Sequence, residues 1–310
     1  RNAALHDELE QYKRTSSSAD RALSEFATAA LPDLVPGLLT DEPVLVLAAR
    51  GIDTNSVTLL QQLLADAGAT SLGTVWFDRR MDLTDAARLE AVADALGLTP
   101  VGDEDRESVT AALAEALTSE TPEPVVIEPE GLPGPAVGDA VTGDPNAEGP
   151  TAVEDDALLP FDAIAALADA ELIDWVDAVG ERARLESFPA GRVRLIVLSG
   201  EGAELNDDIV VQPLVRAIAA DRSGLLVGEV HKPRSTSDAI RDAVQERRGM
   251  TVDFVREDDT LRNRVVTVDN VESGWGRLAA VLAFSGVDQR LSGAYGVADS
   301  ADQVLPDAEG

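Results

Sequence analysis

Few residues of this 310-residue chain carry side chains that could do chemistry, and His231 is the first of them. It follows a predicted strand, at the carboxyl end where α/β proteins place their sites, so a functional role stays open for it. The second histidine, His6, lies in a predicted helix, and neither histidine has the G-x-S-x-G turn of an activated serine nearby. The acidic pairs at 207–208 and 258–259 are interpreted as solvated surface. We therefore predict no catalytic residue and no enzymatic activity.

Nucleotide and metal sites have equally little support. The nearest approach to a phosphate-binding loop is Gly200-Glu201-Gly202, which lacks the third glycine and would present Glu201 and Glu204 to a pyrophosphate of like charge. We interpret it as a turn. The chain has no cysteine, and its two methionines, Met81 and Met250, are far apart in sequence, whereas copper(I) prefers cysteine or methionine sulfur. We predict no cofactor and no metal site.

Charge and composition exclude further classes. The net charge of −32 makes nucleic acid an unsuitable partner, because phosphate binding depends on Lys and Arg. With 45% hydrophobic residues the chain has enough apolar side chains for a core. No run of eighteen apolar residues is present to span a membrane. Because the chain starts with Arg1 and not Met, we expect a signal or membrane anchor upstream.

The elements that must position these groups alternate between buried strands and amphipathic helices. An uninterrupted apolar run, typical of a strand covered on both faces, occupies residues 43–49, and further strands are predicted at 72–77, 193–198, 225–230 and 265–268. Helical periodicity lies between them, at 82–96, 107–117, 158–185, 209–220, 238–247 and 276–284, and in a helix that Asn55 or Ser56 would cap and Gly68 would end. Two strand–helix–strand units echo one another. The predicted fold is α/β, a doubly wound, mostly parallel sheet built from two βαβ halves behind an N-terminal coiled-coil helix.

The first thirty residues carry the a/d seam of a coiled coil. Apolar residues recur at alternating spacings of four and three, with only Ser16 interrupting the pattern: Leu5, Leu9, Tyr12, Ala19, Leu23, Phe26 and Ala30. We predict that this helix stops at Leu31 and Pro32 and serves as a partner-binding surface. The alternative is a helix that lies on its own domain. Whether the seam pairs with a second copy of the chain or with another protein is left open.

These elements give five predicted regions. They are a coiled-coil helix at 1–31, a first α/β half at 32–118, an acidic loop at 119–157, a second α/β half at 158–300 and a disordered tail at 301–310. The loop is rich in Pro and Gly and has no basic residue, so it cannot build a core; only 125–127 could pair as a short edge strand.

Two C-terminal segments, 265–277 and 291–297, resemble the actinobacterial envelope family named copper transporter MctB, which includes the SteB-like proteins. The residues that carry this resemblance are Asp269, Asn270, Gly274, Gly276, Arg277, Leu291, Ser292, Gly293, Tyr295 and Gly296. Physically, the first segment has the composition of a strand-to-helix turn, with Ser273 before the helix and glycines that permit close approach, and Tyr295 is expected to be a packed aromatic.

The resemblance implies a protein at the extracytoplasmic face of the cell membrane, anchored by an upstream helix. For SteB-like members it implies a coiled coil that binds and activates a septal peptidoglycan hydrolase during cell separation, together with a membrane-protein partner of the SteA type. The family name implies copper efflux or homeostasis instead. The scarcity of copper ligands favours the hydrolase regulator. A third alternative is a small-molecule-binding α/β domain, with its ligand near Gly51 or Gly200 at the strand ends.

Overall fold

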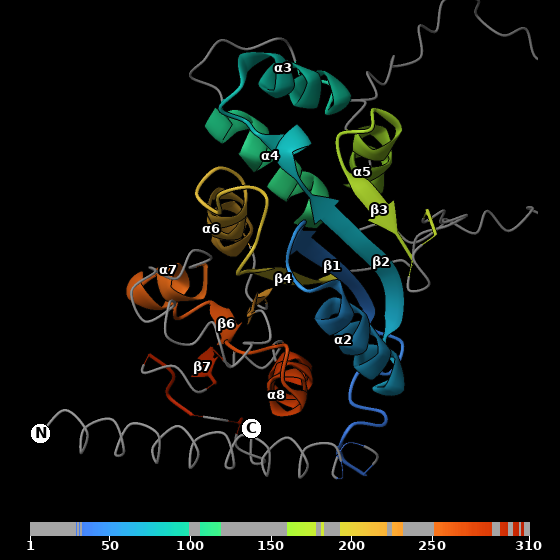
Figure 1. Cartoon of the computed structure of the whole chain (residues 1–310), viewed down its shortest axis with the longest axis vertical. Helices are drawn as coiled ribbons and strands as arrows, with labels where there is room; N and C mark the ends of the chain where they lie inside the picture. Colours follow the sequence, from blue (N-terminus) through green and yellow to red (C-terminus); the bar gives the residue numbers. More distant parts are fainter. Residues whose placement is uncertain are drawn as a thin grey trace, which may run out of the picture.

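The computed structural model describes residues 29, 31, 33–98, 106–118, 160–177, 181–182, 193–221, 225–231, 251–286, 292–296, 300–303 and 305–306. Within them, seven strands form one sheet in the order β3-β2-β1-β4-β5-β6-β7 (Figure 1). Every pairing in this sheet is parallel except that of β2 with β3. The chain proceeds from β1 to one side and later from β4 to the other, so the strand order reverses between β1 and β4.

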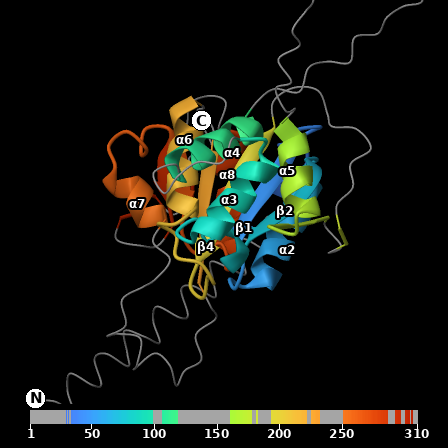
Figure 2. The same cartoon turned by 90° about the horizontal axis from the view of Figure 1, so that it is seen from above.

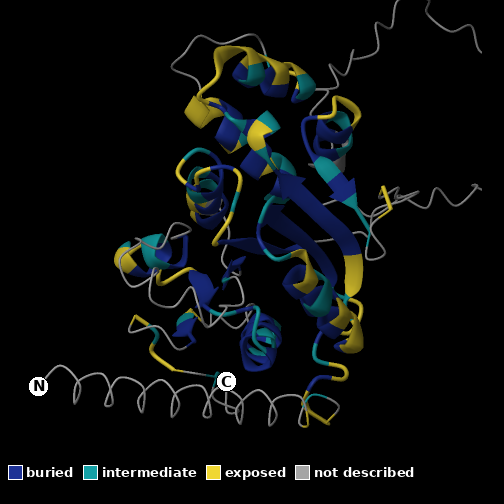
Figure 3. Cartoon of the chain, viewed as in Figure 1, coloured by how far each residue is buried: buried dark blue, intermediate teal, exposed yellow. Residues whose placement is uncertain are grey.

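The strands are short and almost entirely buried, as Figure 3 shows. Their bounds are β1 (Pro43–Ala49), β2 (Thr70–Phe77), β3 (Asp174–Val176), β4 (Arg194–Gly200), β5 (Leu225–Val230), β6 (Val265–Val268) and β7 (Gly293–Tyr295). In the central pairings, Leu47 lies opposite Val75 of β2 and Val197 of β4. The continuous apolar runs follow from this position, because a central parallel strand buries both of its faces.

Helices cover both faces of the sheet, and in Figure 2 the strands lie between them. One face is covered by α2 (Thr54–Asp66) and α8 (Gly274–Ser285). The other is covered by α3 (Ala86–Ala95), α4 (Arg106–Thr118), α5 (Pro160–Asp169), α6 (Val211–Asp221) and α7 (Thr251–Glu257). Alternate residues of β1 point into the cores on opposite faces of the sheet. Val44 and Val46 pack in the core under α2 and α8, and Leu45 and Leu47 pack in the core under α3 to α7. Within the described ranges, no helix combines the length and the apolar character needed to cross a membrane.

The predicted α/β class with a mostly parallel sheet is confirmed, and so are the five predicted strands. The predicted helix at 158–185 is wrong beyond its first part. Helix α5 ends at Asp169, Glu171 takes a left-handed backbone conformation (φ 57°), and β3 then runs antiparallel beside β2. Trp175 lies opposite Val75, and its indole Nε1 donates to the carbonyl of Leu72 at 2.9 Å. This edge strand gives a buried indole the acceptor that it needs.

Two predicted helix starts are also wrong. Helix α2 is capped by Asp53, whose carboxylate accepts from the backbone N–H and the hydroxyl of Ser56, and not by Asn55 or Ser56. The helix predicted from residue 82 begins only at Ala86, after a 3₁₀ turn at Arg79–Met81, because Asp85 is its cap. In both cases an aspartate accepts the first free N–H groups of the helix, which is the favoured solution.

The predicted helix stop at Leu31 and Pro32 is wrong, because helical residues follow it. Leu31, Asp33 and Leu34 are helical, and the N–H of Val35 donates to the carbonyl of Leu31 at 3.1 Å. A proline removes only its own donor, so this hydrogen bond is unaffected by it. Several predictions lie outside the described residues: the seam at Leu5, Leu9, Tyr12, Ala19, Leu23, Phe26 and Ala30, the loop at 119–157, the helix at 238–247, Met250 and Leu291.

Candidate functional site

The C-terminal signature residues meet at the turn from β6 to α8. Asn270 takes a left-handed conformation (φ 60°), and Ser273 caps the helix by accepting from the N–H of Gly276 at 2.9 Å. A Cβ at Gly276 would lie 2.1 Å from the carbonyl oxygen of Asn270. The predicted capping role of Ser273 is confirmed. Glycine is required at 276 because the helix start lies directly against the end of the strand.

Asp269 forms a buried ion pair with Arg256 of α7, at 3.0 Å from Nη1 to Oδ2. The same guanidinium donates to the hydroxyls of Thr267 and Ser300 and to the carbonyl of Tyr295, each at 2.9 Å. Four of its five N–H donors are therefore engaged, and its charge is neutralised by a carboxylate that is 2% exposed. The sequence gives no local sign of Arg256, because its partners lie 11 to 44 residues further along the chain.

Three more signature residues fix the same corner of the domain. Tyr295 is buried in β7, and a Cβ at Gly293 would lie 2.6 Å from its hydroxyl oxygen. Arg277 donates to the carbonyls of Val271 and Glu272, and burial lowers the pKa of this guanidinium. These contacts join β6, α8 and β7. In the described structure, the signature residues therefore hold the backbone of these three elements in place.

The strand-order reversal between β1 and β4 is the place where doubly wound sheets usually bind ligands. Here the loops after β1 and β4 contact one another. The N–H of Glu204 donates to the carbonyl of Arg50 at 2.7 Å, and a Cβ at Gly51 would lie 2.2 Å from the carbonyl oxygen of Gly202. At Gly200 a Cβ would lie 2.0 Å from the carbonyl oxygen of Val230. Close approach of backbone therefore explains the glycines at 51 and 200 without a ligand.

His231 lies at the carboxyl end of β5, between buried Glu229 and half-buried Glu272. Its Nε2 is 3.8 Å from Oε1 of Glu229, and its backbone N–H donates to Glu272 at 3.0 Å. Burial raises the pKa of Glu272 to about 7, with a further contribution from the charge of Asp269. The cluster is thus able to exchange a proton near neutral pH, and it ties the end of β5 to the β6–α8 turn.

Metal ligands do not gather in the part of the chain that the structure describes, where no group of three His, Asp or Glu side chains could hold an ion. Met81 is fully buried in the core, so its sulfur is unavailable to a metal in solution.

Asp207 corrects the interpretation of the acidic pairs as surface. It is buried, accepting from the hydroxyl of Ser199 in β4 and from the hydroxyl of Thr251 in α7, the latter at 2.6 Å. Burial raises its pKa. Its neighbour in sequence, Asp208, is exposed. The carboxylate joins the loop after β4 to the start of α7, a role that its position in an acidic pair does not indicate.

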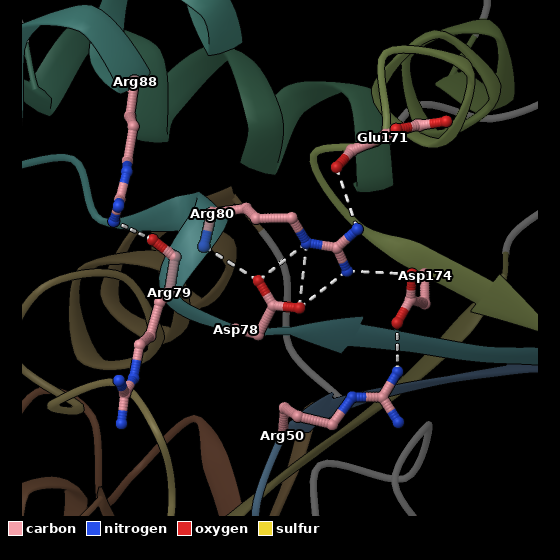
Figure 4. A network of polar contacts seen from close by, with 7 residues as sticks. All are labelled: Arg50, Asp78, Arg79, Arg80, Arg88, Glu171 and Asp174. Atoms are coloured by element: carbon pink, nitrogen blue, oxygen red, sulfur yellow. Dashed lines mark hydrogen bonds and ion pairs between the residues drawn. The ribbon is translucent and has the colours of Figure 1, made fainter.

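An arginine–aspartate network, Figure 4, joins the ends of β1 and β2 to the edge strand β3. Arg80 contacts Asp78 at 2.6 Å and Asp174 at 2.8 Å, Arg50 pairs with the other oxygen of Asp174, and the Arg50 guanidinium lies 4.7 Å over the ring of Trp76. Burial works against ionisation of Asp174, but Arg80 and Arg50 outweigh it and lower the pKa of this carboxyl. Because these guanidinium groups are satisfied within the protein, the network fixes β3 and is not a free anion site.

The described end of the N-terminal helix presents an apolar side chain to solvent. Leu34 is 46% exposed and is the one large hydrophobic residue among the described ones with such exposure. Leu31, one turn earlier, packs partly against the core under α2 and α8. Of these two described leucines, one is therefore packed against the domain and the other is uncovered.

A family model described as copper transport outer membrane protein, MctB, matches residues 1–306. No curated protein matches the chain. The matched span includes the predicted coiled-coil seam as well as the whole α/β sheet.

Proposed function

Because the chain belongs to the MctB family, a family of copper-related envelope proteins, we propose that it acts in the cell envelope as a non-enzymatic protein whose N-terminal helix binds a partner protein. The partner is a peptidoglycan hydrolase with a coiled coil of its own, which this chain activates during septation. A membrane-protein partner of the SteA type completes the assembly. The chain lies at the extracytoplasmic face of the cell membrane, anchored by an upstream helix.

The observation that carries this proposal is the apolar stripe of the N-terminal helix. The sequence places Phe26 and Ala30 on the seam; the next d position is Asp33, and Leu34 follows it at the flanking e position, helical and 46% exposed. Residues four apart lie on one face of a helix. An uncovered apolar side chain at an e position, beside the predicted seam, is one that a second helix would partly bury.

The chemistry of the α/β domain supports a scaffold and not an enzyme. His231 is held between Glu229 and Glu272, and its contacts tie the end of β5 to the β6–α8 turn. The loops at the strand-order reversal contact one another through their backbones. The working surface that remains is the helix.

The experiment substitutes two seam positions, Leu9→Asp with Leu23→Asp. Binding to the coiled coil of the hydrolase, measured by calorimetry, should be lost, because charges cannot be buried in the seam without a partner. The matched control is Gln11→Asp with Thr28→Asp, which adds the same charge at outward c and f positions and should bind normally. Thermal unfolding should show the α/β domain intact in both variants. Unchanged binding by the seam variant would refute the proposal.

Copper handling is the second candidate, and the description of the family favours it. In this case copper would be the cargo of the protein. Its ligands would have to come from residues outside those that the structure describes, since Met81 is buried and the chain has no cysteine. Titration with Cu(I) in competition with a chromophoric chelator tests it. Tight, stoichiometric binding would favour copper handling, and binding no tighter than to the matched chelator blank would exclude it for this chain.

A further inference from the structure

A cavity of about 360 Å³ lies between α7, β6 and β7, at the end of the sheet opposite to β3. Thr267, Gly293 and Ala294 contribute strand residues to its lining, and Val255 contributes an apolar side chain from α7. Its volume is within the range of small-molecule sites, roughly 300–1,000 Å³. It is separate from the strand-order reversal between β1 and β4.

Buried Arg256 lines this cavity without being available to a ligand as a charge. Its guanidinium is paired with Asp269 and donates to Thr267, Ser300 and the carbonyl of Tyr295. Together these contacts fix the floor of the cavity. The charges that a ligand would meet must therefore come from the rim.

The rim carries charges of both signs that do not pair with one another. Arg262, Glu257 and Asp302 all line the cavity, and none of the three forms an ion pair with any group that the structure describes. Their backbones are held in place: the N–H of Asp302 donates to the carbonyl of Ala294 at 2.7 Å, and the N–H of Arg262 donates to that of Asp258 at 2.9 Å. Positive and negative side chains that line one cavity without pairing with each other are able to bind a ligand that carries a negative and a positive group.

We propose that this cavity binds a small zwitterion, a free amino acid or a short peptide with an α-ammonium group and a carboxylate. Arg262 receives the ligand carboxylate, and Asp302 with Glu257 receives the ammonium. Guanidinium is suited to the first role because it binds carboxylates through two parallel hydrogen bonds. The proposal concerns the α/β domain alone and does not depend on partner binding by the N-terminal helix.

The experiment is calorimetric titration of the full chain with L-alanine, dialanine and trialanine as probes. One extended residue adds about 3.3–3.6 Å between the two charges, so the preferred length distinguishes a free amino acid from a peptide. Each preferred probe is compared with its N-acetylated and its C-amidated form, which lack one charge each. We expect both blocked forms to bind at least tenfold more weakly than the zwitterion.

Two variants assign the charges. Arg262→Gln should remove the preference for the free carboxylate over the amide, and Asp302→Asn should reduce the preference for the free amine over the N-acetyl form. Arg79→Gln, which removes an exposed arginine at the other end of the sheet, should leave every affinity unchanged. Absence of saturable binding by all three probes would overturn the proposal. So would equal binding of the zwitterionic and the blocked probes.

Discussion

Gly296 lies directly against the carboxylate of Asp269: a Cβ at position 296 would be 2.1 Å from both Cγ and Oδ1 of that side chain. The carboxylate cannot move aside, because Arg256 holds it at 3.0 Å. The backbone after β7 thus closes over the buried ion pair, which only a residue without a side chain permits. Two residues of the C-terminal signature, Asp269 and Gly296, therefore depend on one another for their packing. This contact explains both residues without a ligand.

Gly296→Ala should destabilise the domain by roughly 2–4 kcal/mol. A methyl group at 296 would overlap the fixed carboxylate, and the backbone there has φ +140°, which side chains disfavour. Gly37→Ala is the matched control, because Gly37 also has a positive φ (+82°) but its Cβ would make only an ordinary contact, 3.8 Å from the hydroxyl oxygen of Thr40. It should cost about 1 kcal/mol. Urea unfolding measures both, and equal losses would contradict the steric explanation.

Arg256→Met should cost about 3–5 kcal/mol, because it leaves Asp269 charged, buried and without its cation. The double variant Arg256→Met with Asp269→Asn should recover part of this loss, since the uncompensated charge is then gone. Arg182→Met breaks an exposed pair with Asp169 and should cost less than about 1 kcal/mol. Chemical unfolding of the four proteins provides the comparison. A single variant no worse than Arg182→Met would contradict a buried, neutralising pair.

The pattern of apolar residues along the sequence predicts those strands and helices whose burial follows from neighbouring residues in the chain. The run at 43–49 is apolar throughout because α2 and α4 to α6 cover opposite faces of β1, and sequence alone indicates a central strand. The spacing of Trp175 from Leu167 and Leu172 fits a helix, and the sequence therefore predicts one there. What redirects the chain is a left-handed Glu171, a residue that gives no turn signal in sequence.

The candidate sites depend on contacts between distant residues, and these could not be predicted. Arg256 meets Ser300 across 44 positions, and Asp207 meets Thr251 across 44. No regular sequence spacing predicts either contact, because each pair is brought together by the order of the strands in the sheet. In contrast, Ser273 and Gly276 were recognised as a turn because capping is a local event with a fixed spacing.

Trp175→Phe should cost about 1–3 kcal/mol, because the carbonyl of Leu72 loses its indole donor in a buried position. The loss should concentrate at the edge of the sheet, where β3 pairs only with β2 among the described strands. Amide hydrogen exchange is the measurement. We expect faster exchange in β3 than in the wild type and unchanged exchange in β5. Uniform acceleration across the sheet would contradict a local role.

Glu272→Gln should make the stability of the domain less sensitive to pH between about 4.5 and 7. Burial raises the pKa of Glu272 from 4.5 to about 7, so in this range the folded protein holds a proton that the unfolded chain has released. The free energy of unfolding therefore falls as the pH rises through the range, and the stability contributed by the protonated acid is complete only below 4.5. Glutamine mimics the protonated acid and still accepts from the N–H of His231.

The two proteins should thus be about equally stable at pH 4, and the variant should be more stable at pH 8 by up to about 3 kcal/mol, at 1.36 kcal/mol per pKa unit. Asp269 and Arg277 face Glu272 with opposite charges and are present in both proteins, so the difference between the two profiles isolates Glu272 itself. Carboxyls with lowered pKa, such as Asp174, lose their contribution as the pH falls, again in both proteins. Urea unfolding from pH 4 to pH 8 gives the profiles, with the exposed Glu90→Gln as the control that should run parallel to the wild type. A Glu272→Gln profile that also runs parallel would mean that Glu272 is ionised throughout this range and that its burial has no energetic consequence.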